Sequence, residues 1–257
     1  MRYLVFFLLV NVSLSCTEYA KIVKGDDYQL KYSTANSLYD KQSYSKAIVL
    51  FEQIYQHSPR SGEGELAFYR LAKCYFELED YYMAEYYFQS YLNKFPYSEN
   101  KEQVSFNKVL CSVRNSPNYS LDQSETNIAI NNIQEFVNRF PQSNFIDTCN
   151  ILIDNLRFKL EKKDFEEVSL YDKTEKFNAA VTAAEIFSSK YPKSRYAEEV
   201  YYLMTKNSFY LAINSVESKK NERTEQSNER FLNFAKKFPN SKYFSELKLL
   251  KKKLNSK

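Results

Sequence analysis

The side chains that most often carry out catalysis are scarce or badly spaced in this chain. Its one histidine, His57, stands beside Ser58 and Pro59, where a helix is expected to end. Carboxylate pairs such as Glu166 and Glu167 are neighbours in sequence, so on a helix they do not face each other. The three glycines are too few and too scattered for a phosphate-binding loop. We therefore expect no catalytic residue, no metal site, no bound cofactor and no enzyme activity.

The charge is mild, with a formal net value of +4 over 257 residues. Part of it comes from lysines at the C-terminal end, which we interpret as the solvated face of a last helix: Lys248, Lys251, Lys252, Lys253 and Lys257. Nucleic-acid binding needs a stronger basic bias on one face, so we expect no nucleic-acid partner. Three glycines, six prolines and no tryptophan, with many leucines, lysines and tyrosines, predict an almost wholly helical chain.

One cysteine has a context that predicts covalent chemistry. Met1 and Arg2 precede an apolar run from Tyr3 to Val12, which is too short to span a bilayer but fits a signal-peptide core. Ser13-Leu14-Ser15-Cys16 follows and resembles a bacterial lipoprotein cleavage site, although Ser13 stands where leucine is expected. We predict a signal peptide over 1–15, lipidation of Cys16 and a polar, lipidated tether over 16–27. The alternative is an ordinary secretory signal that happens to end near a cysteine.

The remaining cysteines are Cys74, Cys111 and Cys149. Their number is odd and none belongs to a C-x-x-C pair, so we expect mostly buried thiols. A bridge between Cys111 and Cys149 stays possible from the sequence.

A short phrase recurs along the chain: an aromatic residue, proline, any residue, then serine. It occurs at Phe95–Ser98, Phe140–Ser143, Tyr191–Ser194 and Phe238–Ser241, and Ser58–Ser61 is a looser first copy. Recurrence at about 35–50 residues is typical of stacked helical repeats. Proline cannot extend the helix before it, and serine is a good helix cap. We therefore predict that the phrase ends one helix and that its serine caps the next.

The residues between these phrases show helical periodicity. Ala35 and Ala47 in the first unit match Ala72 and Ala84 in the second at a constant offset, with aromatic residues beside them. Small residues where two helices cross resemble the tetratricopeptide repeat (TPR). This predicts an all-α fold, a right-handed superhelix (α-solenoid) of about five long TPR-like helix pairs over residues 28–257. The expected repeats are 28–60, 61–97, 98–142, 143–193 and 194–240, with a capping helix in 241–257.

Three local features are expected within this frame. An insertion at 114–120 interrupts the third unit, and Asp122 and Glu125 offer a capping box for the helix that follows. Residues 144–172 contain no helix breaker and predict one long helix. The stretch 218–228 is strongly polar and is expected to be exposed.

The TPR resemblance also suggests a binding surface, because the first helix of each TPR pair lines the groove. Six residues on the expected groove face would form an aromatic site with one amide and one cation: Tyr32, Asn36, Tyr39, Tyr69, Lys73 and Phe76. Such a site suits a peptide with alternating aromatic side chains and a terminal carboxylate. The alternative is that the tyrosines belong to the core between repeats.

A lipoprotein signal followed by five long TPR units resembles the BamD (YfiO-like) family, lipoproteins of the outer-membrane β-barrel assembly machinery. Phrases that look like Bacteroidetes-type members are 16–24, 80–84, 119–123 and 211–220. The resemblance implies a lipid-anchored scaffold on the periplasmic face of the outer membrane. It implies binding to the barrel assembly protein (BamA-like) through its POTRA domains, mainly by the C-terminal repeats, and contact with other assembly subunits. It also implies that the N-terminal repeats receive the C-terminal strands of unfolded outer-membrane proteins.

Two other readings stay open. A generic TPR envelope lipoprotein, YbgF-like and linked to peptidoglycan or division, would carry an N-terminal coiled coil, and no heptad run follows Cys16. A SusD-type glycan-binding lipoprotein would be about twice as long and rich in tryptophan, which this chain lacks.

Overall fold

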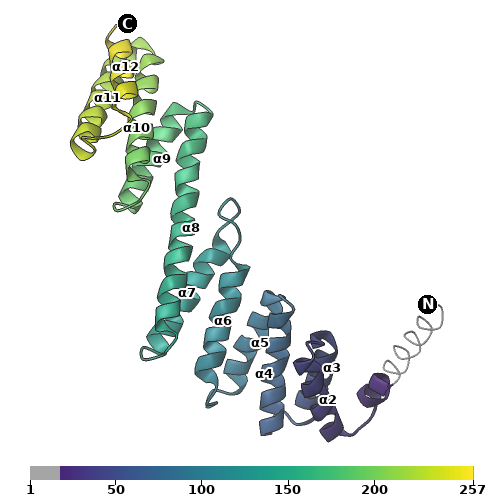
Figure 1. Ribbon diagram of the computed structural model, residues 1–257. Helices are drawn as coiled ribbons and strands as arrows, with labels where there is room; N and C mark the ends of the chain where they lie inside the picture. Colours follow the sequence, from purple (N-terminus) through teal and green to yellow (C-terminus); the bar gives the residue numbers. More distant parts are fainter. Residues whose placement is uncertain (1–17, 257) are drawn as a thin grey trace, which may run out of the picture. The chain divides into compact units, whose positions relative to one another are not determined.

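The computed structural model describes residues 18–256, and over that range it is built from helices without a strand (Figure 1). The signal segment and Cys16 lie outside the described residues. The helices follow one another as five pairs and a final helix: α2 (Tyr28–Asp40), α3 (Tyr44–His57), α4 (Gly62–Glu77), α5 (Tyr81–Lys94), α6 (Lys101–Asn115), α7 (Ser124–Arg139), α8 (Ile146–Lys173), α9 (Phe177–Lys190), α10 (Ala197–Ile213), α11 (Glu217–Lys237) and α12 (Phe244–Asn255). The prediction of an all-α solenoid of TPR-like helix pairs is confirmed, and so are the long helix near 144–172 and the final helix.

The chain forms two compact units. Unit 1 is Met1–Pro117 with Asp122–Ile153, and unit 2 is Asn118–Leu121 with Asp154–Lys257. Each unit has its own apolar core, so each can be described by itself.

The core of unit 1 is organised around the repeated alanines. Ala35, Ala47, Ala72 and Ala84 are all completely buried, with Phe51 and Phe88 among the large side chains beside them. Because alanine has a single methyl group, the helices of a pair can approach closely, and the aromatic rings fill the space on either side. The alanine spacing read from the sequence therefore marks true helix crossings.

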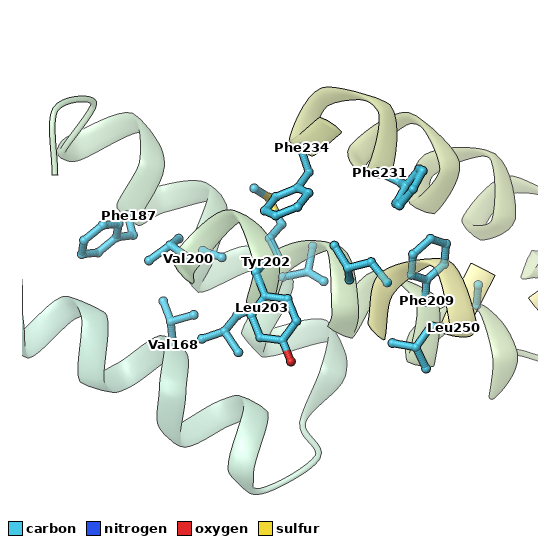
Figure 2. Packing of buried hydrophobic residues seen from close by; sticks show 14 of the residues in the cluster. Val168, Phe187, Val200, Tyr202, Leu203, Phe209, Phe231, Phe234 and Leu250 are labelled. Atoms are coloured by element: carbon cyan, nitrogen blue, oxygen red, sulfur yellow. The ribbon is translucent and has the colours of Figure 1, made fainter. Parts of the chain in front are cut away.

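Unit 2 has a core of larger side chains from α8 to α12. Figure 2 shows Val168 of α8, Phe187 of α9, Phe209 of α10 and Leu250 of α12 among the side chains that fill it. The rings of Phe209 and Phe231 lie 6.1 Å apart between centroids, so α10 and α11 meet through aromatic contacts. α12 packs against this core through its apolar side, which includes Leu250.

The aromatic-proline-x-serine phrase forms a tight turn between repeats. In the copy after α5 the Ser98 N–H donates to the Phe95 carbonyl at 3.1 Å, and the same bond recurs in the other four copies. Proline at the second position suits such a turn because its φ is fixed. The phrase therefore ends a helix as predicted.

The capping role assigned to the serines is correct for one copy and wrong for the others. Ser61 is the N-cap of α4, and its hydroxyl accepts from the Gly64 N–H at 3.0 Å. Ser98 lies three residues before α6 begins, and its hydroxyl accepts from Asn100 N–H at 3.0 Å. The last three copies follow the Ser98 pattern, with acceptance from the residue two positions on: Ser143, Ser194 and Ser241. These serines shape the turn and do not cap the helix.

A second kind of turn joins the two helices in three of the five pairs. Three residues there have positive φ, near 60°: Gln42 (59°), Glu79 (60°) and Glu175 (55°). In the turn after α4, the Glu79 N–H donates to the Phe76 carbonyl and the Asp80 N–H to the Tyr75 carbonyl, both at 3.0 Å. This is the Schellman arrangement, which satisfies carbonyls at the end of a helix and reverses the chain. Glycine is the usual residue at such positions, and this chain uses glutamine and glutamate instead.

Residues 18–24, expected to form part of a polar tether, are helical instead. The Tyr19 hydroxyl donates to the Lys46 carbonyl at 2.9 Å, and Ile22 packs against the unit 1 core. Lys31, only 3% exposed, donates to the Val23 carbonyl at 3.1 Å and to Gln53 Oε1 at 2.8 Å. The sequence did not predict this helix because the residues that face the repeat, Tyr19, Ile22 and Val23, are spread among charged residues.

The insertion before α7 also differs from its prediction. Asp122 Oδ1 accepts from the Ser124 N–H at 2.8 Å, two residues on, and α7 begins at Ser124 with Gln123 as its N-cap. This bond is that of an Asx-type turn, and the N-cap of α7 is Gln123 where the prediction had placed Asp122. Further along the insertion, Lys163 of α8 donates to the Leu121 carbonyl at 2.7 Å, and the Lys162 ammonium lies 4.2 Å from the centre of the Tyr119 ring.

The polar stretch 218–228 belongs to α11, and most of it is exposed or half-buried as expected, apart from the fully buried Ser227. Cys74, Cys111 and Cys149 are free and fully buried. The possible bridge between Cys111 and Cys149 is thus absent from the structure.

Candidate functional site

The six predicted groove residues lie on α2 and α4 in unit 1, and all six are half-buried. The four aromatic ones pack against the unit 1 core: Tyr32, Tyr39, Tyr69 and Phe76. Each ring therefore supports the core, as one of the two readings expected, and keeps some exposed surface.

Asn36 and Tyr39 of α2 are brought together by an arginine from the next repeat. Arg70 Nη1 donates to Asn36 Oδ1, and the guanidinium carbon lies 5.5 Å from the centre of the Tyr39 ring. A guanidinium over an aromatic face is held by a cation–π attraction. Arg70 thus links α2 to α4 and places a half-buried cation on this face.

Lys73 and Phe76 form a second cluster on α4 alone. The Lys73 ammonium lies 3.1 Å from a carboxylate oxygen of Glu77 and 4.7 Å from the centre of the Phe76 ring. The side chain of Lys73 is 21% exposed and that of Glu77 35% exposed. The side chain of Lys73 thus keeps some exposed surface, and its ammonium is paired with the Glu77 carboxylate.

Tyr69 and Tyr32 are less closely connected with these clusters. The Tyr69 hydroxyl accepts from Asn107 Nδ2 of α6 at 3.2 Å, and its ring meets Phe88 and Tyr91. Tyr69 therefore belongs to the contact with the third repeat. Tyr32 packs against the core from α2.

Burial dominates the electrostatics of this face. It raises the pKa of Tyr39 to about 12, and the nearby Glu77 carboxylate adds to the shift. It also raises the pKa of the Cys74 thiol to about 12, although Arg70 acts in the opposite direction. Tyr39 and Cys74 are therefore neutral at physiological pH, and Arg70, Lys73 and Glu77 carry the charges of the site.

Arg70 is the residue that sequence reasoning missed. The expected groove face was chosen by helical spacing within each repeat, and Arg70 lies one position away from Tyr69 on a different line of that helix. The available signal was its long cationic side chain directly beside a predicted groove residue. Spacing within one helix does not reveal that the Arg70 side chain extends back to Asn36 in the preceding repeat.

The arrangement presents two cations, a carboxylate and aromatic rings on one part of unit 1. Within residues 18–256 no group of histidine, cysteine and carboxylate side chains is placed to hold a metal ion. His57, outside this site, stacks on Tyr28 at 3.6 Å between ring centres, and its Nδ1 is 2.8 Å from the Ser58 hydroxyl. Among those same residues no helix is both long and apolar enough to cross a membrane.

The fold and this face define a helical-repeat protein of the TPR type. The family model named YfiO, described as an outer membrane lipoprotein, matches residues 25–185 and again residues 168–257. The chain therefore belongs to the YfiO family of outer membrane lipoproteins.

Solved structures with a similar fold are distant. MamA from Desulfovibrio magneticus RS-1 (residues 41 to the end) is 14% identical, with a TM-score of 0.40 over 82% of this chain and 95% of that one. A TPR repeats protein from Bacteroides fragilis NCTC 9343 is 11% identical, with a TM-score of 0.41 over 90% of this chain and 99% of that one. No curated protein matches the chain.

Proposed function

We propose that this protein is a lipid-anchored, non-enzymatic scaffold of the β-barrel assembly machinery on the periplasmic face of the outer membrane, of the Bacteroidetes type. Acyl chains on Cys16 anchor it, and it binds a BamA-like barrel assembly protein through its POTRA domains. The observation that carries the proposal is the family match, which extends over the helices of both units. The phrases in 16–24, 80–84, 119–123 and 211–220 support the assignment to the Bacteroidetes type.

We further propose that unit 1 receives the C-terminal strands of unfolded outer-membrane proteins at Arg70, Lys73 and the rings beside them. A peptide that ends in a carboxylate would displace Glu77 from Lys73, and its aromatic side chains would lie against Tyr39 and Phe76. Cations and aromatic rings together suit such a peptide, because a charged hydrogen bond at the end fixes its register.

The scaffold role is tested by a pull-down from detergent-solubilised envelopes with a tag on the C-terminus. Recovery of the barrel assembly protein supports the proposal. Recovery of peptidoglycan or division factors without it would refute the proposal and favour the generic envelope lipoprotein.

The peptide site is tested by cross-linking to a barrel-signal peptide made with either a free carboxylate or an amide at its end. The wild-type protein should prefer the free carboxylate about tenfold, because one charged hydrogen bond is worth about 1.5 kcal/mol or more. Lys73→Gln should remove this preference, and Glu77→Gln should increase it by freeing the ammonium. Tyr39→Ala with Lys73→Glu should weaken cross-linking further, and a thermal melt must show that this double variant stays folded. Equal cross-linking of both peptides to the wild type and to Lys73→Gln would refute the site.

A further inference from the structure

The last part of the chain has an unusual charge. Residues 236–256 contain seven lysines, one glutamate, no arginine and no aspartate, a net charge of +6 in a chain whose total is +4. This segment covers the end of α11, the turn and α12. The rest of the molecule is therefore slightly acidic, and the basic charge is concentrated at one end of unit 2.

The charges of these lysines are not neutralised by carboxylates of the part of the chain that the structure describes. Among residues 18–256 the ion pairs involve other cations, and none of the seven takes part in one. Glu246, the only carboxylate of the segment, accepts a hydrogen bond from the Tyr202 hydroxyl at 2.7 Å. Lys237 donates to the Tyr201 hydroxyl at 2.7 Å, and Lys251 lies 4.8 Å from the centre of the Phe231 ring. These contacts are made by the ammonium groups with neutral partners, so they leave the positive charge uncompensated.

α12 separates an apolar side from a basic side. Leu247, Leu250 and Leu254 are at most 6% exposed, and Figure 2 shows Leu250 pointing into the core beside Phe209. The opposite side of the helix carries four exposed residues, which we call the basic face: Lys248, Leu249, Lys252 and Lys253. Lys248 and Lys252 are four residues apart, as are Leu249 and Lys253, so the two pairs lie together on the helix surface. Leu249 is 68% exposed in the middle of this face.

We infer that the basic face of α12 binds the surface of an anionic phospholipid bilayer. A row of unpaired ammonium groups attracts phosphate headgroups, and an exposed leucine among them can enter the boundary between headgroups and acyl chains. This gives the molecule a membrane contact in unit 2 that is separate from an acyl chain on Cys16. This contact is independent of the peptide site and of the barrel assembly protein.

The choice of side chains favours a lipid surface over an acidic protein. Interfaces between proteins are enriched in arginine and aromatic residues and depleted in lysine, because arginine forms fixed paired bonds with carboxylates. Lysine is a mobile point charge that suits a layer of phosphates with no fixed geometry. All seven cations of this segment are lysines, and the exposed apolar residue among them is aliphatic.

The test uses the full chain with Cys16→Ser, so that no anchor contributes, and measures co-sedimentation with vesicles. Vesicles of phosphatidylglycerol and phosphatidylcholine should bind the protein at low salt, and pure phosphatidylcholine should not. Lys248→Gln with Lys252→Gln and Lys253→Gln should weaken binding about 100-fold, because each lysine near an anionic surface is worth about fivefold. Leu249→Ser should weaken it about tenfold at unchanged charge.

A matched control removes the same charge elsewhere, from lysines exposed in other parts of the chain: Lys101, Lys193 and Lys219. This control should bind vesicles almost as well as the parent, and thermal melts of all variants show that α12 remains folded. Equal loss in the control and in the α12 variant would overturn the inference, since binding would then follow net charge alone. Capture of soluble polyglutamate without vesicle binding would also overturn it and would identify an acidic protein as the partner.

Discussion

The serines of the recurring phrase should differ greatly in their contribution to stability, although the sequence presents them as equivalent. The Ser98 hydroxyl donates to Glu65 Oε1 at 2.7 Å, lies 2.8 Å from the Tyr91 hydroxyl and accepts from the Asn100 N–H at 3.0 Å. Ser143, in the same unit, accepts from the Phe145 N–H at 3.1 Å and has no comparable carboxylate contact. The two serines are therefore a matched pair within one folding unit.

The expected magnitude follows from these contacts. Ser143→Ala removes one turn hydrogen bond to a backbone group that water can reach, which costs about 0.5–1 kcal/mol. Ser98→Ala removes a similar bond and also the bond to the Glu65 carboxylate, and bonds to charged groups are worth about 1.5–3 kcal/mol. The free energy of unfolding should therefore fall by about 2–3 kcal/mol in the Ser98 variant, some 1.5–2 kcal/mol more than in the Ser143 variant.

Urea denaturation, followed by tyrosine fluorescence and by circular dichroism, measures the difference in the free energy of unfolding between the two variants. With a slope of about 2 kcal/mol per M, the midpoint of the Ser98 variant should lie about 0.75–1 M below that of the Ser143 variant. Tyr91→Phe combined with Ser98→Ala closes a double-mutant cycle and should show coupling, because both hydroxyls share Glu65. Equal midpoints for Ser98→Ala and Ser143→Ala would refute the reasoning.

Three other predictions follow from features of the same structure. Glu79→Ile should lower the free energy of unfolding by about 1–2 kcal/mol relative to Glu79→Asn, because asparagine tolerates positive φ and a β-branched residue does not. Thermal unfolding of the two variants measures this difference in stability. Leu250→Ala should cost about 2–5 kcal/mol by leaving a cavity, whereas Leu249→Ala should cost under about 0.5 kcal/mol; equal losses would contradict the orientation of α12. Burial raises the pKa of both Cys74 and Cys111 to about 12, whereas a cysteine in the unfolded chain has a pKa of about 8.5. The stability that the two neutral thiols contribute is therefore complete below about pH 8.5 and falls as the pH rises toward 12. A thiol reagent at pH 8 should accordingly react with them only after denaturant is added, and fast reaction of the native protein would disprove their burial.

The sequence predicts features that depend on spacing within one helix and misses those that depend on contacts between helices. Ala35 and Ala72 reveal the helix crossings because only small residues fit there, and their spacing is repeated. Ser98 looked like a helix cap because the same residue types serve caps and short turns, and only the position of the first helical residue distinguishes the two. Arg70 was missed because its partner Asn36 lies in the preceding repeat. The register between repeats is set by tertiary packing, which one helix does not encode.

The helix at residues 18–24 bears on the proposed lipid anchor at Cys16, because it lies within the segment expected to be a tether. A tether over 16–27 would allow about 40 Å between the lipid and the first repeat, because an extended residue spans about 3.6 Å at most. Residues 18–24 form a helix that is docked through Tyr19 and Ile22, so this part of the expected tether is not extended. An acylated Cys16 would then keep unit 1 close to the headgroups, and the proposed capture of unfolded chains would take place in a thin layer beside the membrane.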